Sequence, residues 1–251
     1  MPIENMKNIN QEKSLQLQKI IDSFSQSIPQ LSVDCVVLCF HDNELKILLS
    51  KFTNLDLWGL QGGYIGQNED VDLAAKRILA ERAHVKDIFL KQFYVFGKAN
   101  RPTSDSLKAL FKDTAYNIDE LPVFKQRFVS IGYYSLVNFQ KVTPTVGLFS
   151  DQCAWFSIGN LPQNIAFDHA DIIAKALETL RNSLDYQRVG FNLMPETFTM
   201  NELQKLYETI LRQTLSRNNF QRKILDMNIL ERLEKKFDGS AHKAPYLYRF
   251  K

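Results

Sequence analysis

The chain has few of the features that mark secreted, membrane or zinc-scaffold proteins. Its 251 residues include only three cysteines, none of them in a CxxC pair, which argues against a disulfide framework and a structural zinc site. The longest purely apolar run, residues 35–40, is far shorter than the roughly 18–20 residues of a membrane span. The polar N-terminus lacks the apolar core of a signal peptide. We therefore expect a cytoplasmic protein without membrane contact.

The sequence also lacks internal repeats and low-complexity segments, and its length fits one large or two modest domains. Its net charge of +3 is small but unevenly distributed. Residues 186–251 carry 12 Lys and Arg against 7 Asp and Glu, whereas the rest of the chain carries 19 against 21. A basic C-terminal segment on a faintly acidic body indicates a polyanionic partner, with a solvated basic surface as the alternative.

Residues 1–185 mix strands and helices without regular alternation, which predicts an α+β fold, here a mixed α/β/α sandwich. Two apolar runs, residues 32–40 and 44–51, flank the turn residues His41-Asp42-Asn43 and predict a hairpin. The same patterns predict strands over 88–98, 128–139 and 152–158, helices over 14–26, 70–83 and 168–184, and a long loop with some helix over 100–127.

Three local predictions refine this outline. Cys35 and Cys39 are four residues apart on an expected strand, so both side chains face the same side and read as core. Asp168 is expected to cap the helix over 168–184, with His169 serving the helix start. The helix over 70–83 is expected to direct four apolar side chains inward: Leu73, Ala74, Ile78 and Leu79.

The basic C-terminal segment follows a different pattern, and residues 186–195 resemble an inter-domain connection. Thr199-Met200-Asn201-Glu202 forms a capping box, which opens a helix that runs to about Leu211. A second helix begins after the N-cap Ser216, and Asp238-Gly239 makes a turn between two short extended runs. A helix, a short turn, a basic helix and a hairpin together outline a winged helix-turn-helix.

The second of these helices is suited to contact DNA. Phe220, Ile224 and Met227 share a face that fits a domain core, while polar side chains and Leu225 point away from it. Arginine can bridge guanine and Asn or Gln can bridge adenine, whereas edge cations meet phosphates. A charged solvated face is the alternative. The expected DNA-binding residues are Arg217, Asn218, Asn219, Gln221, Arg222, Lys223, Lys236, His242 and Lys243.

A second pattern lies in residues 62–85. Gly63 is followed after five residues by Glu69, and seven further residues lead to Arg77, with Glu81 four positions later. This spacing resembles the Nudix box, G-x5-E-x7-R-E-U-x-E-E-x-G-U, in which U is a bulky aliphatic residue. In Nudix hydrolases the carboxylates of this helix hold Mg²⁺ against a pyrophosphate. The resemblance implies a Nudix-like fold with Gly63, Glu69, Arg77 and Glu81 as ligand-binding residues.

The sequence departs from that pattern where the metal would bind. Ile78 and Arg82 replace two of the three helix carboxylates, so only Glu81 is kept. Mg²⁺ needs oxygen ligands, and a guanidinium repels it. We therefore expect no catalytic residues, no metal, no cofactor and no hydrolysis. Two structural alternatives stay open for the remaining carboxylates: Glu81 pairs with Arg77 on the same helix, and Glu69 serves the fold of the loop.

The two domains together carry a more specific resemblance. Residues 193–208, 218–223 and 246–250 resemble the winged-helix domain of the NrtR-like family of Nudix-related transcriptional regulators, and residues 166–170 resemble a segment of that family's Nudix-like domain. The resemblance covers most of the chain. It implies a dimeric DNA-binding repressor with a degenerate Nudix-like effector-binding domain over 1–185 and a winged-helix DNA-binding domain over 186–251. We expect the effector to release the protein from its DNA operator.

The resemblance leaves the effector open, since family effectors include ADP-ribose-type nucleotides and sugars. The lost carboxylates remove the reason to expect a metal-bound pyrophosphate. On that ground we favour a sugar such as L-arabinose, and hence a role in carbohydrate metabolism, over an ADP-ribose-like nucleotide. Two other functions remain as alternatives: a Nudix pyrophosphohydrolase acting on ADP-ribose-like substrates with relocated metal ligands, and an adaptor whose basic domain docks on an acidic protein.

Overall fold

The computed structural model of the protein describes residues 15, 18, 21–22, 25–52, 56–83, 89–101, 126–146, 150–184, 189–236 and 244–251. Its elements in chain order are β1 (Ser27–His41), β2 (Glu44–Phe52), β3 (Trp58–Gly59), β4 (Gln61–Gly66), α2 (Val71–Ala83), β5 (Phe89–Phe96), β6 (Val129–Val137), η2 (Phe139–Lys141), β7 (Ser150–Ser157), α5 (His169–Ser183), α6 (Val189–Leu193), β8 (Phe198–Thr199), α7 (Met200–Leu211), α8 (Arg217–Asp226), β9 (Leu230–Lys235) and β10 (Tyr246–Phe250).

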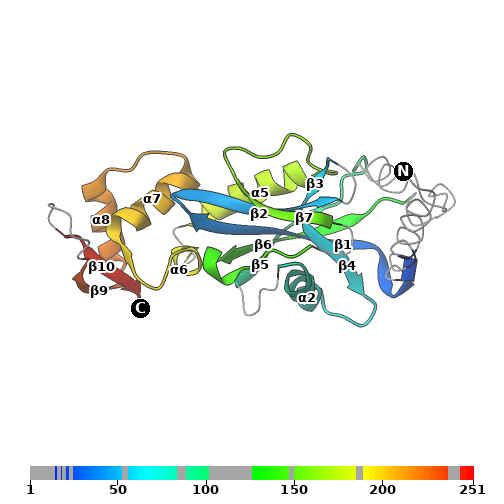
Figure 1. Cartoon of the computed structure of the whole chain (residues 1–251), viewed down its shortest axis with the longest axis horizontal. Coiled ribbons are helices and arrows are strands. Elements are labelled where there is room, and N and C mark those ends of the chain that lie inside the picture. Colours follow the sequence, from blue (N-terminus) through cyan, green and yellow to red (C-terminus); the bar gives the residue numbers. More distant parts are fainter. Residues whose placement is uncertain are drawn as a thin grey trace, which may run out of the picture.

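A mixed seven-stranded sheet forms the larger part of the molecule, with α2 on one face and α5 on the other (Figure 1). Its main path runs β3-β2-β1-β6-β5, with β4 also paired to β1 and β7 to β2. Strand β1 lies parallel to β6 and antiparallel to β2. The predicted hairpin of β1 and β2 is confirmed. Its turn residues Asp42 and Asn43 both take a positive φ, 54° and 59°, which Asp and Asn tolerate better than most residues.

Alternate side chains of β1 build two apolar cores, one on each face of the sheet. Val36 and Leu38 join the core beneath α5, whereas Cys35 and Cys39 join the core beneath α2. A strand buried on both faces reads as a continuous apolar run rather than an alternating one, as residues 35–40 do. The predicted core placement of the two cysteines is therefore confirmed.

The packing of α2 corrects one of the predicted inward positions. Ala74, Ile78 and Leu79 are buried as expected, but Leu73 is 53% exposed. Ala75, which was not predicted, is fully buried in its place. The inner stripe of α2 therefore runs through residues 74, 75, 78 and 79, and Leu73 falls about 100° outside it because each helical residue turns by that angle.

The C-terminal domain has the predicted order of helix, helix and hairpin. Thr199 and Glu202 form the capping box at the start of α7. Strands β9 and β10 pair antiparallel and, with β8, make a three-stranded sheet. The expected inward position of Met227 is wrong, since its side chain is 38% exposed. Helix α8 ends at Asp226, so Met227 leaves the inner face that Phe220 and Ile224 define.

The two parts of the molecule share one apolar core. Phe198, Leu206 and Tyr207 of the winged helix belong to the same cluster of buried side chains as Ile47 of the sheet and Leu180 of α5. A polar contact reinforces this junction. It runs from the Arg181 side chain on α5, whose Nε donates to the Ile210 carbonyl on α7 at 2.8 Å. The winged helix therefore packs directly on the sandwich at one end of the long axis (Figure 1).

The predicted fold class, an α/β/α sandwich followed by a winged helix-turn-helix, is confirmed. The strands predicted over 88–98, 128–139 and 152–158 correspond to β5, β6 and β7, and the helix over 168–184 to α5. Among residues 14–26, the few that are described between Leu15 and Ser25 are helical. Most of the predicted loop over 100–127 lies outside the described residues. No helix in the described part of the chain is long and apolar enough to cross a membrane.

Because the core is shared, truncating one side chain in α7 should weaken the whole fold. Leu206 is fully buried, and we expect Leu206→Ala to lower the free energy of unfolding by about 2–5 kcal/mol. The matched control is Leu73→Ala on the exposed side of α2, which should change it by less than about 0.5 kcal/mol. Urea denaturation followed by tryptophan fluorescence measures both. Equal losses in the two variants would contradict the shared core.

Candidate functional site

The Arg77 guanidinium organises the loop and helix that carry the Nudix-like pattern. Its Nε and Nη2 donate to the Glu69 carboxylate at 2.7 and 2.9 Å, and Nη2 also donates to the Tyr64 carbonyl at 2.9 Å. Nη1 lies 3.4 Å from both carboxylate oxygens of Glu81. Glu69 in turn accepts from the Gly66 amide at 3.1 Å. The two structural roles left open above are therefore both present: Glu69 holds the loop, and Glu81 pairs with Arg77.

These contacts shift the proton affinities of the groups involved. Hydrogen bonding to Arg77 lowers the pKa of Glu69, and the Gly66 amide lowers it further. Hydrogen bonding to Glu69 raises the pKa of Arg77 in return. Both groups are therefore held in their charged forms. The arrangement is a partly exposed ion network that fixes the turn between β4 and α2.

Ile78 occupies the helix position where the Nudix pattern has its first carboxylate. Its side chain is 2% exposed and belongs to the core between α2 and the sheet. It packs directly against Gly63, where an added Cβ would lie 2.9 Å from the Ile78 Cγ1. Gly63 is therefore explained by close packing on Ile78. An apolar side chain fills the space beside the loop.

The residues at this site do not fit the Mg²⁺ that the Nudix pattern implies. Both remaining carboxylates, Glu69 and Glu81, are bound to the Arg77 guanidinium. Lys76 and Arg82 add two further cations on the same helix. Within the described ranges, no group of three or more His, Cys, Asp or Glu could hold a metal ion. Mg²⁺ favours several oxygen ligands in octahedral geometry, which two carboxylates paired with Arg77 do not offer.

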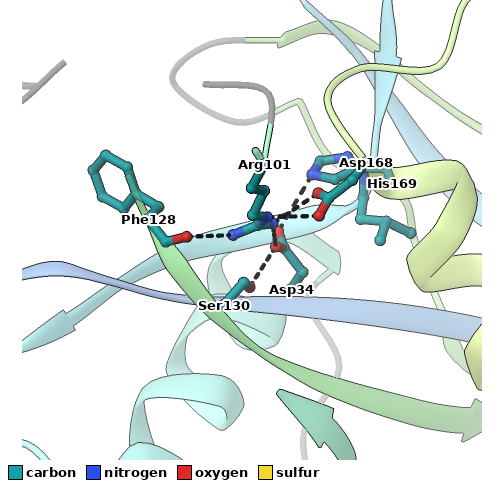
Figure 2. A network of polar contacts seen from close by, with 7 residues as sticks. Asp34, Arg101, Phe128, Ser130, Asp168 and His169 are labelled. Carbon is teal, nitrogen blue, oxygen red and sulfur yellow. Dashed lines mark hydrogen bonds and ion pairs between the residues drawn. The ribbon is translucent and has the colours of Figure 1, made fainter. Parts of the chain in front are cut away.

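A second network of charged side chains is buried where β1, β6 and α5 meet (Figure 2). Arg101 donates to both carboxylate oxygens of Asp168 at 2.6 and 2.9 Å and to Asp34 at 3.2 Å. The Ser130 hydroxyl donates to the same Asp34 oxygen at 2.5 Å, and the Phe128 carbonyl lies 3.4 Å from Arg101 Nη1. Burial opposes the charge of Arg101, but Asp168 and Asp34 outweigh it and raise the pKa of the guanidinium.

His169 connects this network to the start of β4. Its Nδ1 accepts from the Leu60 amide at 3.0 Å, so the neutral ring carries its proton on Nε2, which lies 3.5 Å from Asp34. Burial lowers the pKa of His169 despite the two nearby carboxylates. Gly62 lies against the same carboxylate, since a Cβ there would be 2.5 Å from Asp34 Oδ1. The lack of a side chain at Gly62 therefore allows this close approach.

Sequence reasoning missed most of this network. Asp168 does occupy the N-cap position of α5, but its side chain makes no capping hydrogen bond and pairs with Arg101 instead. Asp34 was the available signal, since an acidic residue within a buried apolar strand needs a partner. That partner lies 67 residues along the chain, so sequence spacing gave no indication of it.

The outer face of α8 carries most of the predicted DNA-binding residues. Asn218, Arg222 and Leu225 follow one another at helical spacing and are exposed, opposite the buried Phe220 and Ile224. Arg217, Asn219 and Lys223 are also exposed. Gln221 is half-buried at the side of the helix, and exposed Lys236 lies 3.5 Å from Glu202. His242 and Lys243 lie outside the described residues.

Comparisons with known proteins agree with this two-part architecture. Residues 190–250 match the NrtR DNA-binding winged helix domain family. A relative from Acinetobacter baylyi, named ADPR responsive transcriptional repressor NtrR, is 28% identical over 230 residues, which cover 88% of this chain and 82% of the relative. The crystal structure of Shewanella oneidensis NrtR complexed with a 27mer DNA superposes with a TM-score of 0.69, at 27% identity and with coverage of 88% and 94%.

A further structural neighbour shares the fold of the whole chain. A MutT/nudix family protein from Enterococcus faecalis covers 100% of this chain and 99% of its own, with a TM-score of 0.65 and 18% identity. That likeness concerns the fold alone. The protein thus has a Nudix-like α/β fold followed by a winged-helix domain. The family match covers the winged helix alone, and the Acinetobacter baylyi and Shewanella oneidensis proteins are similar to this chain over most of its length.

The buried network should contribute strongly to stability, because removing one partner leaves charges that are buried and unpaired. We expect Arg101→Met to lower the free energy of unfolding by about 3–5 kcal/mol. The matched control is Arg249→Met, which removes an exposed ion pair with Glu231 at 2.8 Å and should cost about 0–1 kcal/mol. Chemical denaturation compares the two, and similar losses would contradict a stabilising network.

The lowered pKa of His169 predicts a specific loss of stability in acid. Below the unfolded pKa of about 6.5 the unfolded imidazole binds a proton that the folded ring does not. The free energy of unfolding should therefore fall as the pH drops through this value. His169→Gln keeps an acceptor for Leu60 and a donor for Asp34 but cannot titrate. Denaturation at about pH 7.5 and about pH 5.5 should show a smaller fall in this variant, and an unchanged fall would contradict the assignment.

Proposed function

We propose that this protein is a cytoplasmic, effector-responsive transcriptional repressor that binds DNA as a homodimer through its winged helix. The observation that carries the proposal is the direct junction of two unlike sites. One is a basic helix whose exposed face combines Asn218 and Arg222, and the other is a Nudix-like loop and helix whose charges do not fit catalysis. The winged helix packs in the core on the α5 face of the sheet, and α2 packs on the opposite face of the same sheet, so the sheet and α5 connect the two sites.

The charge and geometry of α8 support DNA as the partner. Arg222 lies opposite the buried side of the helix, where it can reach guanine, and Asn218 one turn earlier can reach adenine. Arg217 and Lys223 on the flanks can meet phosphates. Exposed Leu225 continues the same face and offers an apolar surface to a thymine methyl group. In a homodimer, two such helices would read a roughly palindromic operator.

For the effector we place an ADP-ribose-type nucleotide first. The Acinetobacter baylyi relative, similar over most of both domains, carries the name ADPR responsive. The preference for L-arabinose drawn from the lost carboxylates, and the link to carbohydrate metabolism, find no support in the relatives named above. Loss of the metal ligands is an argument against hydrolysis and leaves nucleotide binding open. The sugar therefore becomes the second candidate.

Helix α5 provides a physical route from the effector site to the DNA-binding domain. It begins at Asp168 and His169, which contact Arg101 and the start of β4, and it ends near Arg181, which binds the Ile210 carbonyl. A ligand that moves the β4–α2 turn would bias the position of α7 through this helix. The effector must prefer one arrangement of the domains, since equal affinity for both would shift nothing. We expect it to release DNA.

Fluorescence anisotropy with DNA from upstream of neighbouring genes tests the proposal. We expect salt-sensitive binding that ADP-ribose reverses and L-arabinose does not. Arg222→Ala should weaken operator binding by about 1–3 kcal/mol. Lys98→Ala, which removes one exposed charge from the Nudix-like domain, is the control and should leave it unchanged.

Three results would contradict parts of this function. An equal loss of operator affinity in Arg222→Ala and Lys98→Ala would mean that net charge alone determines binding, and not the position of the charge on α8. Release by L-arabinose alone would restore the sugar as the effector. Turnover of ADP-ribose without any DNA binding would favour the pyrophosphohydrolase.

A further inference from the structure

Glu208 joins the end of α7 to the beginning of α8 through both its main chain and its side chain. Its carbonyl accepts from the amide of Arg212, which ends α7 with a φ of 54°, and from the Gln213 amide at 3.2 Å. Its carboxylate oxygen Oε1 accepts from the Leu215 amide at 2.9 Å. One residue therefore binds amides along the whole turn that connects the two helices.

Gln204, one helical turn before Glu208, holds the other polar group of Leu215. Its Nε2 donates to the Leu215 carbonyl at 2.9 Å and to Glu208 Oε1 at 3.1 Å. The amide and the carbonyl of Leu215 are thus both bound by side chains of α7. The hydrogen bond from the Leu215 amide, followed by that from Gln204, lowers the pKa of Glu208, so the acceptor is held in its charged form.

These contacts fix the direction in which the chain enters α8. Ser216 occupies the N-cap position of α8, but its side chain makes no capping hydrogen bond. The rings of Tyr207 and Phe220, with centroids 5.2 Å apart, hold α8 against α7, yet apolar burial is non-directional. Hydrogen bonds to the main chain are directional, so Gln204 and Glu208 supply the angular constraint that apolar packing lacks.

The direction of α8 matters because base contacts need defined hydrogen-bond geometry, whereas phosphate attraction depends mainly on charge. We propose that Gln204 and Glu208 are positioning residues for DNA recognition, which hold α8 at the angle that presents Asn218 and Arg222 to the bases. This inference rests on the DNA-binding function proposed above. Neither Gln204 nor Glu208 needs to touch the DNA.

The negative charge of Glu208 separates a positioning role from simple electrostatics. Removing an acidic group from a DNA-binding domain should by charge alone strengthen its binding to any DNA. A positioning role predicts weaker binding to the operator when Glu208 loses its side chain, while binding to unrelated DNA does not weaken. The two explanations therefore predict changes of opposite sign in operator affinity.

Fluorescence anisotropy of the full chain tests the role with two DNA fragments of equal length, one from upstream of neighbouring genes and one with its sequence scrambled. The ratio of the two affinities measures sequence recognition. Glu208→Ala and Gln204→Ala should each lower this ratio about 5- to 100-fold, which is the discrimination of one lost base contact. Glu208→Gln has the same charge as Glu208→Ala but keeps an acceptor for the Leu215 amide, and it should recover most of the ratio.

The control is Glu196→Ala, which removes an exposed carboxylate from the same domain and should keep the wild-type ratio. A wild-type ratio in both Glu208→Ala and Gln204→Ala would refute the positioning role and leave the DNA-binding function intact. Equal losses in Glu208→Gln and Glu208→Ala would assign the effect to charge and refute it as well.

A wild-type protein that binds both fragments equally would refute the sequence-specific function and this inference together. Thermal unfolding checks that each variant folds. If Glu208→Ala does not fold, the ratio for Gln204→Ala decides the question, and an undiminished value there counts against the assignment.

Discussion

The ion network of Asp34, Arg101 and Asp168 is the constraint on which the arrangement of the other elements depends. It joins a strand at the centre of the sheet to the first residues of α5, and His169 extends it to the start of β4. A buried charge is costly unless its partners are in place, so these elements can pack in few other ways. The network thereby fixes the start of β4 and the start of α5 relative to the central strand β1.

The network is connected to both parts of the molecule, through the start of β4 to the Nudix-like loop and through α5 to the winged helix. Helix α2 carries Ile78 and Arg82 where the Nudix pattern has carboxylates, so it lacks the oxygen ligands that Mg²⁺ needs. Helix α5 packs on α7 through the shared core and the Arg181 contact, so the orientation of α7 depends on that of α5. The same fold that positions a substrate in an enzyme can therefore position a DNA-reading helix in a regulator.

Local patterns predicted the structure well, and long-range contacts explain what they missed. The Asp42-Asn43 turn and the Thr199 capping box were predictable because a few adjacent residues determine them. Leu73 and Met227 were misplaced because periodicity alone does not say where a buried stripe lies or where a helix ends. The Arg101 network could not be predicted, since its members come from distant segments and only Asp34 gave a local signal. The Nudix-like spacing suggested Gly63, Glu69, Arg77 and Glu81 as ligand residues, which stays a prediction. The pairing of Glu69 with Arg77 required the structure.

Phosphorus NMR of ADP-ribose mixed with the full-length protein tests the central claim, that this Nudix-like site binds its ligand without cleaving it. The account predicts that both diphosphate resonances shift on binding, with EDTA present or Mg²⁺ added, and that neither is replaced by another signal over time. Growth of phosphomonoester resonances, which report cleavage of the diphosphate bond, would contradict it.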